Sequence, residues 1–511
     1  MTARRLLPLA VLLVVLPTLF RAPTLDEESY LWLGAHLDPT RPYSWTRSWP
    51  PYDGDGFVYA HPPLHLWWMW LLHGLPVALQ RVVSSVVWGS LLGWGVGVLA
   101  ERSTRRAALA SALWLSSSVV LLGLQSALMV DLPAAALLTG GLALYRISLD
   151  SESRRDEVLA GLLLGLATMT KYPMAMALPI VALHAWRRGG SFLPVMVASG
   201  VFLADEGVLF LLHGREHLWE VWSRREEIPH GAAAPRALGV LARAALLPLP
   251  FLLFRTDPLT SLFGVAFAVL ALVTVQPPGL SPAEGTVMLL FCIGGGLLLA
   301  RAARTLPLRP GRRRKGDQDD GFLLGGVLLV WLVGVALTHN YASARYLLPA
   351  AAPAAILLAR SAEEVRGGKA LAWASAAASG VLAVAVAVAD YRYARAGWTV
   401  GEEAAQVGVG QFAGEWSFRA AMEGAGWVRL GPDTPAPQVG EWVVVVDNAS
   451  PGAVDTTGWE PVRRIESDDQ FPLRVNDPGR NVSLYAETLG TLPLGWSEGR
   501  LEGATLYKVS R

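Results

Sequence analysis

Carboxylates and cations that could do chemistry stand at the edges of the apolar segments of this chain. Asp26 and Glu27 follow directly after the first apolar segment, and Asp131 begins another. Lys171, in TKYP, and Arg345, in RYLLP, also lie where apolar sequence meets polar sequence. Ammonium and guanidinium groups are well suited to holding phosphate. The set would suit a phosphate-bearing substrate if all five residues share one face of the protein.

Each of these residues also has a structural explanation. Asp131 could be a helix N-cap, Lys171 could extend toward lipid headgroups, and Arg345 could anchor its segment at the interface. Asp26 could cap an amphipathic helix that lies along the membrane over residues 27–37. The chemical interpretation therefore depends on whether these side chains meet.

The composition places them in a membrane protein. The 511 residues are 52% hydrophobic and only 17% charged, whereas soluble domains carry about a quarter charged residues. The apolar residues form runs of roughly 15–22, long enough to cross a bilayer. We predict a polytopic α-helical membrane protein with about thirteen transmembrane helices. The predicted spans are residues 6–20, 82–100, 107–123, 131–147, 158–170, 172–187, 191–213, 236–254, 258–275, 284–300, 321–338, 346–360 and 369–389.

Alternate loops between these spans are basic, which predicts their sidedness. Loops rich in Lys and Arg stay in the cytoplasm, so the N-terminus is predicted inside and the C-terminus outside. The first segment is expected to remain as a span, because no small-residue cleavage motif follows it. The basic loops are residues 101–106, 146–157, 186–190, 301–320 and 360–369.

On this topology the candidate residues fall on the outer face. Ionisable groups at span ends on one side are typical of a site at the membrane surface, rather than of a channel through its middle. Eight of the nine histidines share this face, namely His36, His61, His65, His73, His213, His217, His230 and His339.

Two domains are predicted. Residues 1–393 form the membrane domain, with long outer loops at 21–81 and 213–235. The composition then changes, and helical stretches, the apolar run EWVVVVDN and the terminal ATLYKVSR predict a small extracytoplasmic α/β domain over residues 394–511. That domain could be a structural cap over the outer face, or it could bind part of the substrate.

Charge and cysteine content bear on nucleic-acid binding and on disulfide formation. The net charge is +1, so nothing in it favours nucleic acid as a partner. Cys292 is the single cysteine, and an internal disulfide is therefore impossible.

The order of the motifs resembles bacterial glycosyltransferases of the C superfamily, in the protein O-mannosyltransferase and aminoarabinose transferase lineage. The resemblance covers roughly residues 1–393. Its elements are the DE pair at Asp26, HPPL from His61, DLP from Asp131, TKYP from Thr170 and RYLLPAAAP from Arg345.

The resemblance implies a polyprenyl-phosphate sugar donor, used on the outer face with inversion of the anomeric centre. It assigns the general base to Asp26, beside Glu27, and gives Asp131 a role in orienting sugar or acceptor. Lys171 and Arg345 are then candidates for holding the leaving phosphate, whose growing charge needs fixed cations. The further candidates for substrate binding are His61, Tyr172, His339 and Tyr346.

Three features depart from the family pattern. Tyr172 stands where the family usually has glycine, so packing around the phosphate could differ. Residues 213–235 have no clear counterpart and could carry acceptor specificity. Glu206 lies beside Asp205 inside a predicted span, where a carboxylate is expensive in lipid; either it reaches a cavity or the span ends earlier.

We therefore predict an integral membrane glycosyltransferase of the cytoplasmic membrane. It would move a sugar from polyprenyl phosphate to a glycan, lipid or protein acceptor at the outer face. No cofactor is assigned, and the need for a divalent metal is left open. The alternatives are a transporter or flippase, although no convincing internal repeat of the kind transporters carry is present, and a non-catalytic scaffold.

Overall fold

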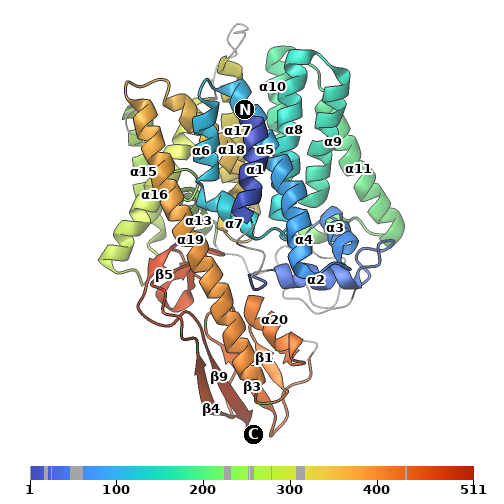
Figure 1. The fold of residues 1–511 in the computed structure, drawn as a ribbon, viewed down its shortest axis with the longest axis vertical. Helices are drawn as coiled ribbons and strands as arrows, with labels where there is room; N and C mark the ends of the chain where they lie inside the picture. Colours follow the sequence, from blue (N-terminus) through green and yellow to red (C-terminus); the bar gives the residue numbers. More distant parts are fainter. Residues whose placement is uncertain are drawn as a thin grey trace.

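Apolar helices form a bundle, and a smaller domain with β-strands lies at one end of it (Figure 1). The structure is a computed structural model that describes residues 2–15, 21–24, 26–45, 61–223, 232–250, 253, 258–277, 279–306, 317–431 and 434–510. His230, parts of the predicted outer loops 21–81 and 213–235, and part of the predicted basic loop 301–320 lie outside the described residues.

Several helices are long and apolar enough to cross a membrane, so the chain is a multi-pass helical membrane protein. Among the described residues seven helical stretches qualify, or eight if one bent pair counts as a single span. The predicted number of thirteen spans and the predicted sidedness stay predictions. The seven are Val77–Ser103 (α4, Val77–Ser84; η3, Ser85–Gly89; α5, Ser90–Ser103), Asp131–Ser151 (α8), Leu193–His213 (α11), Pro258–Val275 (α15), Pro282–Arg304 (α16), Asp320–Thr338 (in α17, Asp317–Thr338) and Gly368–Ala405 (α19).

The other predicted spans correspond to shorter helices. The predicted span 107–123 divides into two helices, α6 (Ala107–Leu115) and α7 (Ser118–Gln125), and the chain bends by 61° at the break between them. The region 158–187 contains two helices, α9 and α10, joined by the short 3-10 segment η4. The bounds of the remaining short helices are α1 Ala3–Val15, α9 Arg154–Thr170, η4 Tyr172–Ala177, α10 Leu178–Arg188, α13 Ala233–Ala244 and α18 Leu348–Ser361.

Close packing of α8 on α9 positions the first pair of site residues. Small residues in α8 let the two helices approach, and a Cβ at Gly141 would come within 2.8 Å of the Leu164 side chain of α9. Asp131 is the first residue of α8. Lys171 follows α9 in an extended conformation, and Pro173, which has no backbone N–H, could not continue the hydrogen bonding of that helix. The start of α8 and the end of α9 therefore lie together.

Two short elements bring the remaining site residues to the same end of the bundle. Asp26 precedes α2 (Glu27–His36), which packs on α3 (Leu64–Leu72). The 3-10 turn η6 (Ala344–Leu347) carries Arg345 and Tyr346 immediately before α18. The short helix α12 (His217–Ser223) follows α11. In Figure 1 both α2 and α3 lie at the end of the bundle nearest the smaller domain.

The smaller domain contains a five-stranded mixed sheet packed against α19 and α20, and two small two-stranded sheets, β5-β8 and β6-β7. The strand order is β2-β1-β3-β9-β4, with β1 parallel to β2 and β3, and β9 antiparallel to β3 and β4. Phe412 and Val444 of the sheet pack with Phe418 of α20 and Val400 at the end of α19. The bounds are β1 Gln411–Ala413, α20 Trp416–Gly424, β2 Val428–Arg429, β3 Trp442–Val446, β4 Trp459–Glu466, β5 Leu473–Arg474, β6 Asn476–Asp477, η7 Pro478–Arg480, β7 Val482–Ser483, β8 Gly495–Trp496 and β9 Gly503–Val509.

The two strands predicted in this domain are confirmed as β3 and β9. The predicted boundary at residues 393 and 394 falls inside α19, which runs unbroken from the bundle into the smaller domain (Figure 1). A second contact joins Arg419 of α20 to Glu28 of α2, at 3.7 Å. The smaller domain is thus attached next to α2, the helix that Asp26 precedes.

Candidate active site

Asp26 forms an ion pair with Arg345. Asp26 occupies the N-cap position of α2, but its side chain makes no capping hydrogen bond. Its Oδ2 instead accepts a hydrogen bond from Nη1 of Arg345 at 2.9 Å. The Asp26 side chain is 38% exposed and that of Arg345 only 16%. The carboxylate therefore combines a fixed cationic partner with access from outside, which a cap alone would not need.

Asp131 and Lys171 form a second, more deeply buried pair. The Lys171 Nζ donates to Asp131 Oδ1 at 2.6 Å, and the two side chains are 5% exposed or less. Asp131 Oδ2 lies 3.8 Å from Nε of Arg345. Two carboxylates and two cations thus alternate in the order Asp26, Arg345, Asp131, Lys171, and we call these four residues the charge cluster. Lys171 is not extended toward lipid headgroups.

Tyr346 supplies an aromatic surface to both cations. The Lys171 Nζ lies 4.1 Å from the centre of its ring, and the Arg345 Cζ lies 5.2 Å from it. Such contacts hold a cation while leaving its N–H groups able to donate elsewhere. The ring of His339 lies 4.7 Å from that of Tyr346, and the hydroxyl of Tyr341 accepts from Nη2 of Arg345 at 3.3 Å. The predicted residues His339 and Tyr346 therefore adjoin the cluster.

His61 lies close to the same cations. Burial, and then the positive charges of Lys171 and Arg345, hold the pKa of His61 well below its ordinary value. The imidazole is therefore neutral at neutral pH, and it can donate one hydrogen bond and accept another. The backbone of His61 is held by Tyr43, whose hydroxyl donates to the His61 carbonyl at 2.8 Å.

Glu27 points to a different partner. Its buried carboxylate accepts from Nη2 of Arg81 in α4 at 3.2 Å and from the backbone N–H of Thr24 at 3.2 Å. The neighbouring Asp26 and Glu27 therefore have separate environments, one in the charge cluster and one inside the protein. This arrangement ties the start of α2 to α4.

Tyr172 also turns away from the charge cluster. Its hydroxyl donates to Glu206 Oε1 of α11 at 2.5 Å and lies 2.5 Å from Nδ1 of His217 in α12. The ring of Tyr43 stacks on His217 with ring centres 4.4 Å apart. We call Tyr43, Tyr172, Glu206 and His217 the tyrosine cluster. Glu206, whose place within a predicted span needed explanation, has its partners here, including the backbone N–H of Leu218 at 3.1 Å.

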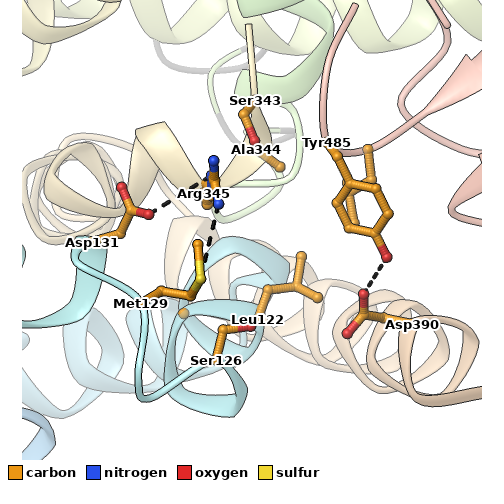
Figure 2. Close-up of a pocket in the computed structure, with 11 residues that line it drawn as sticks. Leu122, Ser126, Met129, Asp131, Ser343, Ala344, Arg345, Asp390 and Tyr485 are labelled. Carbon is orange, nitrogen blue, oxygen red and sulfur yellow. Dashed lines mark hydrogen bonds and ion pairs between the residues drawn. The ribbon is translucent and has the colours of Figure 1, made fainter. Parts of the chain in front are cut away.

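A pocket opens beside the charge cluster, toward the smaller domain (Figure 2). Its empty space is about 410 Å³, a figure that includes space open to solvent. Figure 2 shows Asp131 and Arg345 at one side and Asp390 and Tyr485 at the other, with Leu122 between them. Apolar groups of the bundle thus lie next to the guanidinium, an arrangement suited to a ligand with an apolar part and an anionic part.

Sequence reasoning missed several residues of this region. Tyr341 lies four residues before Arg345 in HNYASARY, so its spacing was a usable signal. Tyr43 and His217 carry no motif, and their meeting depends on how α11 and α12 fold back. Asp390 and Tyr485 belong to α19 and to the smaller domain, and no local pattern links them to Arg345.

Within the described part of the chain, no group of three or more His, Cys, Asp or Glu side chains is arranged to hold a metal ion.

The fold and this geometry define a multi-pass membrane protein with a charged site at one end of its helix bundle. Residues 60–204 match the family of dolichyl-phosphate-mannose-protein mannosyltransferases. The resemblance to this glycosyltransferase lineage, predicted from the motifs, is thereby confirmed. The matched region holds His61, Asp131, Lys171 and Tyr172, whereas Asp26 and Arg345 lie outside it.

Two solved structures are similar to the chain at low identity. Both are crystal structures of ArnT from Cupriavidus metallidurans, one bound to undecaprenyl phosphate and one in the apo state. Each is 16% identical, and each match covers 86% of this chain and 92% of ArnT, with TM-scores of 0.41 and 0.37. No curated protein matches the chain.

Proposed function

We propose that this protein is a glycosyltransferase that moves a sugar from a polyprenyl-phosphate donor to an acceptor at the extracytoplasmic face of the cytoplasmic membrane. The family match over residues 60–204 supports this chemistry. Residues 1–393 would form the membrane transferase domain and residues 394–511 the extracytoplasmic domain. The acceptor would be a glycan, a lipid or a protein that carries a free hydroxyl.

The reaction we propose is a single displacement that inverts the anomeric centre. The acceptor oxygen attacks the anomeric carbon while the bond from that carbon to the phosphate oxygen breaks. The phosphate leaves with the bonding electron pair, and the acceptor proton passes to the Asp26 carboxylate. A positioned carboxylate contributes about 10²–10⁴-fold in such proton transfers. The exposure of Asp26 leaves room for an acceptor to approach it.

The departing phosphate would be held by Arg345 and Lys171. Both cations already contact carboxylates of the charge cluster, so an incoming phosphate would share or replace those contacts. A phosphate oxygen bound to Arg345 would compete directly with Asp26 Oδ2, which lies 2.9 Å from Nη1. Donor binding would thereby release the base for its task. Asp131 would keep both cations in place.

The other predicted residues take supporting roles in this proposal. His61, His339 and Tyr346 would donate hydrogen bonds to the phosphate or the sugar from around the charge cluster. Glu27, through Arg81, would hold the start of α2 and so the position of Asp26. Tyr172 would hold η4 against α11 and thereby fix the backbone next to Lys171.

The observation that carries the proposal is the contact between Asp26 and Arg345. The solvent-accessible carboxylate of Asp26 lies within hydrogen-bond distance of the mostly buried guanidinium of Arg345. A second buried cation, Lys171, is linked to Arg345 through the carboxylate of Asp131. This contact supports the proposal that the Asp26 carboxylate accepts the proton while the cations hold the leaving phosphate.

The decisive variant is Asp26→Asn, which keeps the shape of the side chain and removes its basicity. A deletion strain would be complemented with the wild type, Asp26→Asn or Asp38→Asn, and its lipid extracts and surface glycans compared by mass spectrometry. Asp38 is an exposed carboxylate beyond the other end of α2, bonded to Thr40, and serves as the matched control. We expect Asp26→Asn to lower transfer about 10²–10⁴-fold and Asp38→Asn to leave it unchanged.

Two results would overturn the proposal. Full transfer by the Asp26→Asn variant at normal protein level would remove the assigned base. Movement of a lipid-linked substrate across proteoliposomes by the purified protein, with no sugar transferred, would identify a transporter instead.

A further inference from the structure

One loop of the smaller domain is bonded to the segment that carries Arg345. We call residues 483–490 the docking loop. The backbone N–H of Ala344 donates to the Leu484 carbonyl at 3.1 Å, and the N–H of Glu487 donates to the Ala342 carbonyl at 3.2 Å. The N–H of Ala342 in turn donates to the Glu487 carboxylate. Three hydrogen bonds therefore hold the two alanines that flank Ser343, directly before Arg345.

A buried arginine of the bundle holds the docking loop itself. Arg243 of α13 is fully buried and donates from Nη2 to the carbonyl oxygens of Ser483 and Gly490, the latter at 3.0 Å. Its Nε also reaches the Leu484 carbonyl at 3.4 Å. The guanidinium thus joins both ends of the loop. The loop is seated in the bundle and is not a free surface of the smaller domain.

A chain of polar contacts also connects the docking loop to the segment that precedes Asp26. The hydroxyl of Tyr485 donates to Asp390 of α19 (Figure 2). Asp390 pairs with the buried Arg21 at 2.6 Å. The Arg21 carbonyl accepts from Nη1 of Arg81 at 2.5 Å, and the same Arg81 binds Glu27. One loop is therefore connected to the segment before Arg345 and to the segment before Asp26.

We propose that the docking loop of the smaller domain positions Arg345 for the lipid phosphate, with Glu487 as the positioning residue. Glu487 touches no part of the charge cluster; it acts through the backbone of Ala342, three residues before Arg345. The inference rests on the proposed function and gives the smaller domain a role in donor binding. A structural cap would instead need only the apolar contacts of the domain.

Two variants disturb this positioning from opposite sides. Glu487→Ala removes the acceptor for the Ala342 N–H, whereas Glu487→Gln keeps an oxygen that can accept it. Gly239→Ala in α13 acts from the bundle, because a Cβ there would lie 2.9 Å from the Glu487 Cβ and 3.1 Å from the Ala342 Cβ. The matched control is Arg463→Ala, which breaks an exposed pair between β4 and Glu403 of α19 and leaves the loop intact.

The experiment measures binding of undecaprenyl phosphate to the full-length variants in nanodiscs, with thermal unfolding in parallel. We expect Glu487→Ala and Gly239→Ala each to weaken binding about tenfold. Glu487→Gln and Arg463→Ala should stay within about twofold of the wild type. If Glu487 acts through Arg345, adding Glu487→Ala to Arg345→Ala should weaken binding by less than about twofold more.

The outcomes separate the inference from the function beneath it. If the wild type binds and Arg345→Ala binds weakly, but folded Glu487→Ala and Gly239→Ala bind like the wild type, the positioning role is wrong. Full additivity of Glu487→Ala and Arg345→Ala would also overturn it, because it would show an effect independent of the arginine. If the wild type itself does not bind undecaprenyl phosphate, the proposed donor fails and the inference fails with it.

Discussion

The charge cluster and the tyrosine cluster meet at the peptide bond between Lys171 and Tyr172, yet they are built differently. Lys171 turns toward Asp131, where two carboxylates alternate with two cations. Tyr172 turns toward Glu206 and His217, where a phenol hydroxyl joins a carboxylate and an imidazole. Lys171 is extended and Tyr172 begins the 3-10 segment η4, so the two neighbouring side chains reach different clusters.

On the proposed function, this difference separates a substrate-binding site from a contact that joins helices. In the charge cluster each cation is shared with a carboxylate, and an anion could take the place of a carboxylate contact at little electrostatic loss. In the tyrosine cluster, the partners of Tyr172 connect η4 to α11 and α12. An anion entering there would have to break the hydrogen bonds that hold those elements together. We therefore expect substrate effects from one cluster and stability effects from the other.

The largest loss of activity is expected from Lys171→Ala, which removes one cation from the charge cluster. Removing a cation that stabilises the leaving phosphate should lower kcat/KM for the lipid donor about a hundredfold or more. Lys171→Arg keeps the charge and should recover part of the loss. Both rates are measured on protein whose fold has been checked by thermal unfolding, since Asp131 would lose its closest partner. A folded Lys171→Ala variant with near wild-type kcat/KM would remove this residue from the phosphate site.

Tyr172→Phe tests the neighbouring residue and should behave in the opposite way. It removes one hydroxyl from Glu206 and His217, so the free energy of unfolding should fall by about 1–3 kcal/mol. The kcat/KM should change by less than about threefold, because the hydroxyl is directed away from the charge cluster. Thermal unfolding and steady-state kinetics on the same preparation check both. A loss of activity as large as in Lys171→Ala would mean that the two clusters form one site.

Sequence reasoning located much of the charge cluster, and the physical reason is simple. Helix ends on one side of a bundle converge, so charged residues at span ends on that side could be expected to meet, and Asp26, Asp131, Lys171 and Arg345 do. The direction of a side chain could not be predicted in the same way. The sequence groups Glu27 with Asp26, but the turn into α2 directs the Glu27 side chain to Arg81.

The contacts between the smaller domain and the helix bundle could not be predicted from the sequence. The domain's two principal strands could be predicted from apolar patterns, because a buried strand is a local property. The docking loop could not, since Arg243 and Ala342 are far in sequence from the loop residues that they contact and reach them through tertiary packing alone. The division of residues 107–123 into two bent helices was also missed, because an apolar run does not reveal a bend.

The smallest predicted effect is a pH dependence of protein stability that arises from a histidine near the charge cluster. His65 of α3 is buried, and its Nε2 lies 2.9 Å from the carbonyl oxygen of Leu128, a residue three positions before Asp131. Burial lowers the pKa of His65 to about 4. Below the ordinary histidine pKa of about 6.5 the unfolded chain binds a proton that the folded protein does not, so stability falls as pH drops from 6.5 toward 4.

We expect the apparent unfolding temperature to decline over that range, and His65→Gln to reduce the decline. His73, exposed at the end of the same helix, provides the control variant His73→Gln. Thermal unfolding at pH 7, 6 and 5 makes the comparison. An identical decline in His65→Gln and in the wild type would show that another group is responsible.

The location of the lipid phosphate tests the central claim most directly. A cryo-EM structure of the full-length protein with undecaprenyl phosphate would show it. We expect phosphate oxygens about 2.8 Å from the guanidinium of Arg345 and the ammonium of Lys171, with the Asp26 carboxylate facing the same space. A phosphate bound at the tyrosine cluster, or anywhere that leaves both cations on their carboxylates, would contradict it.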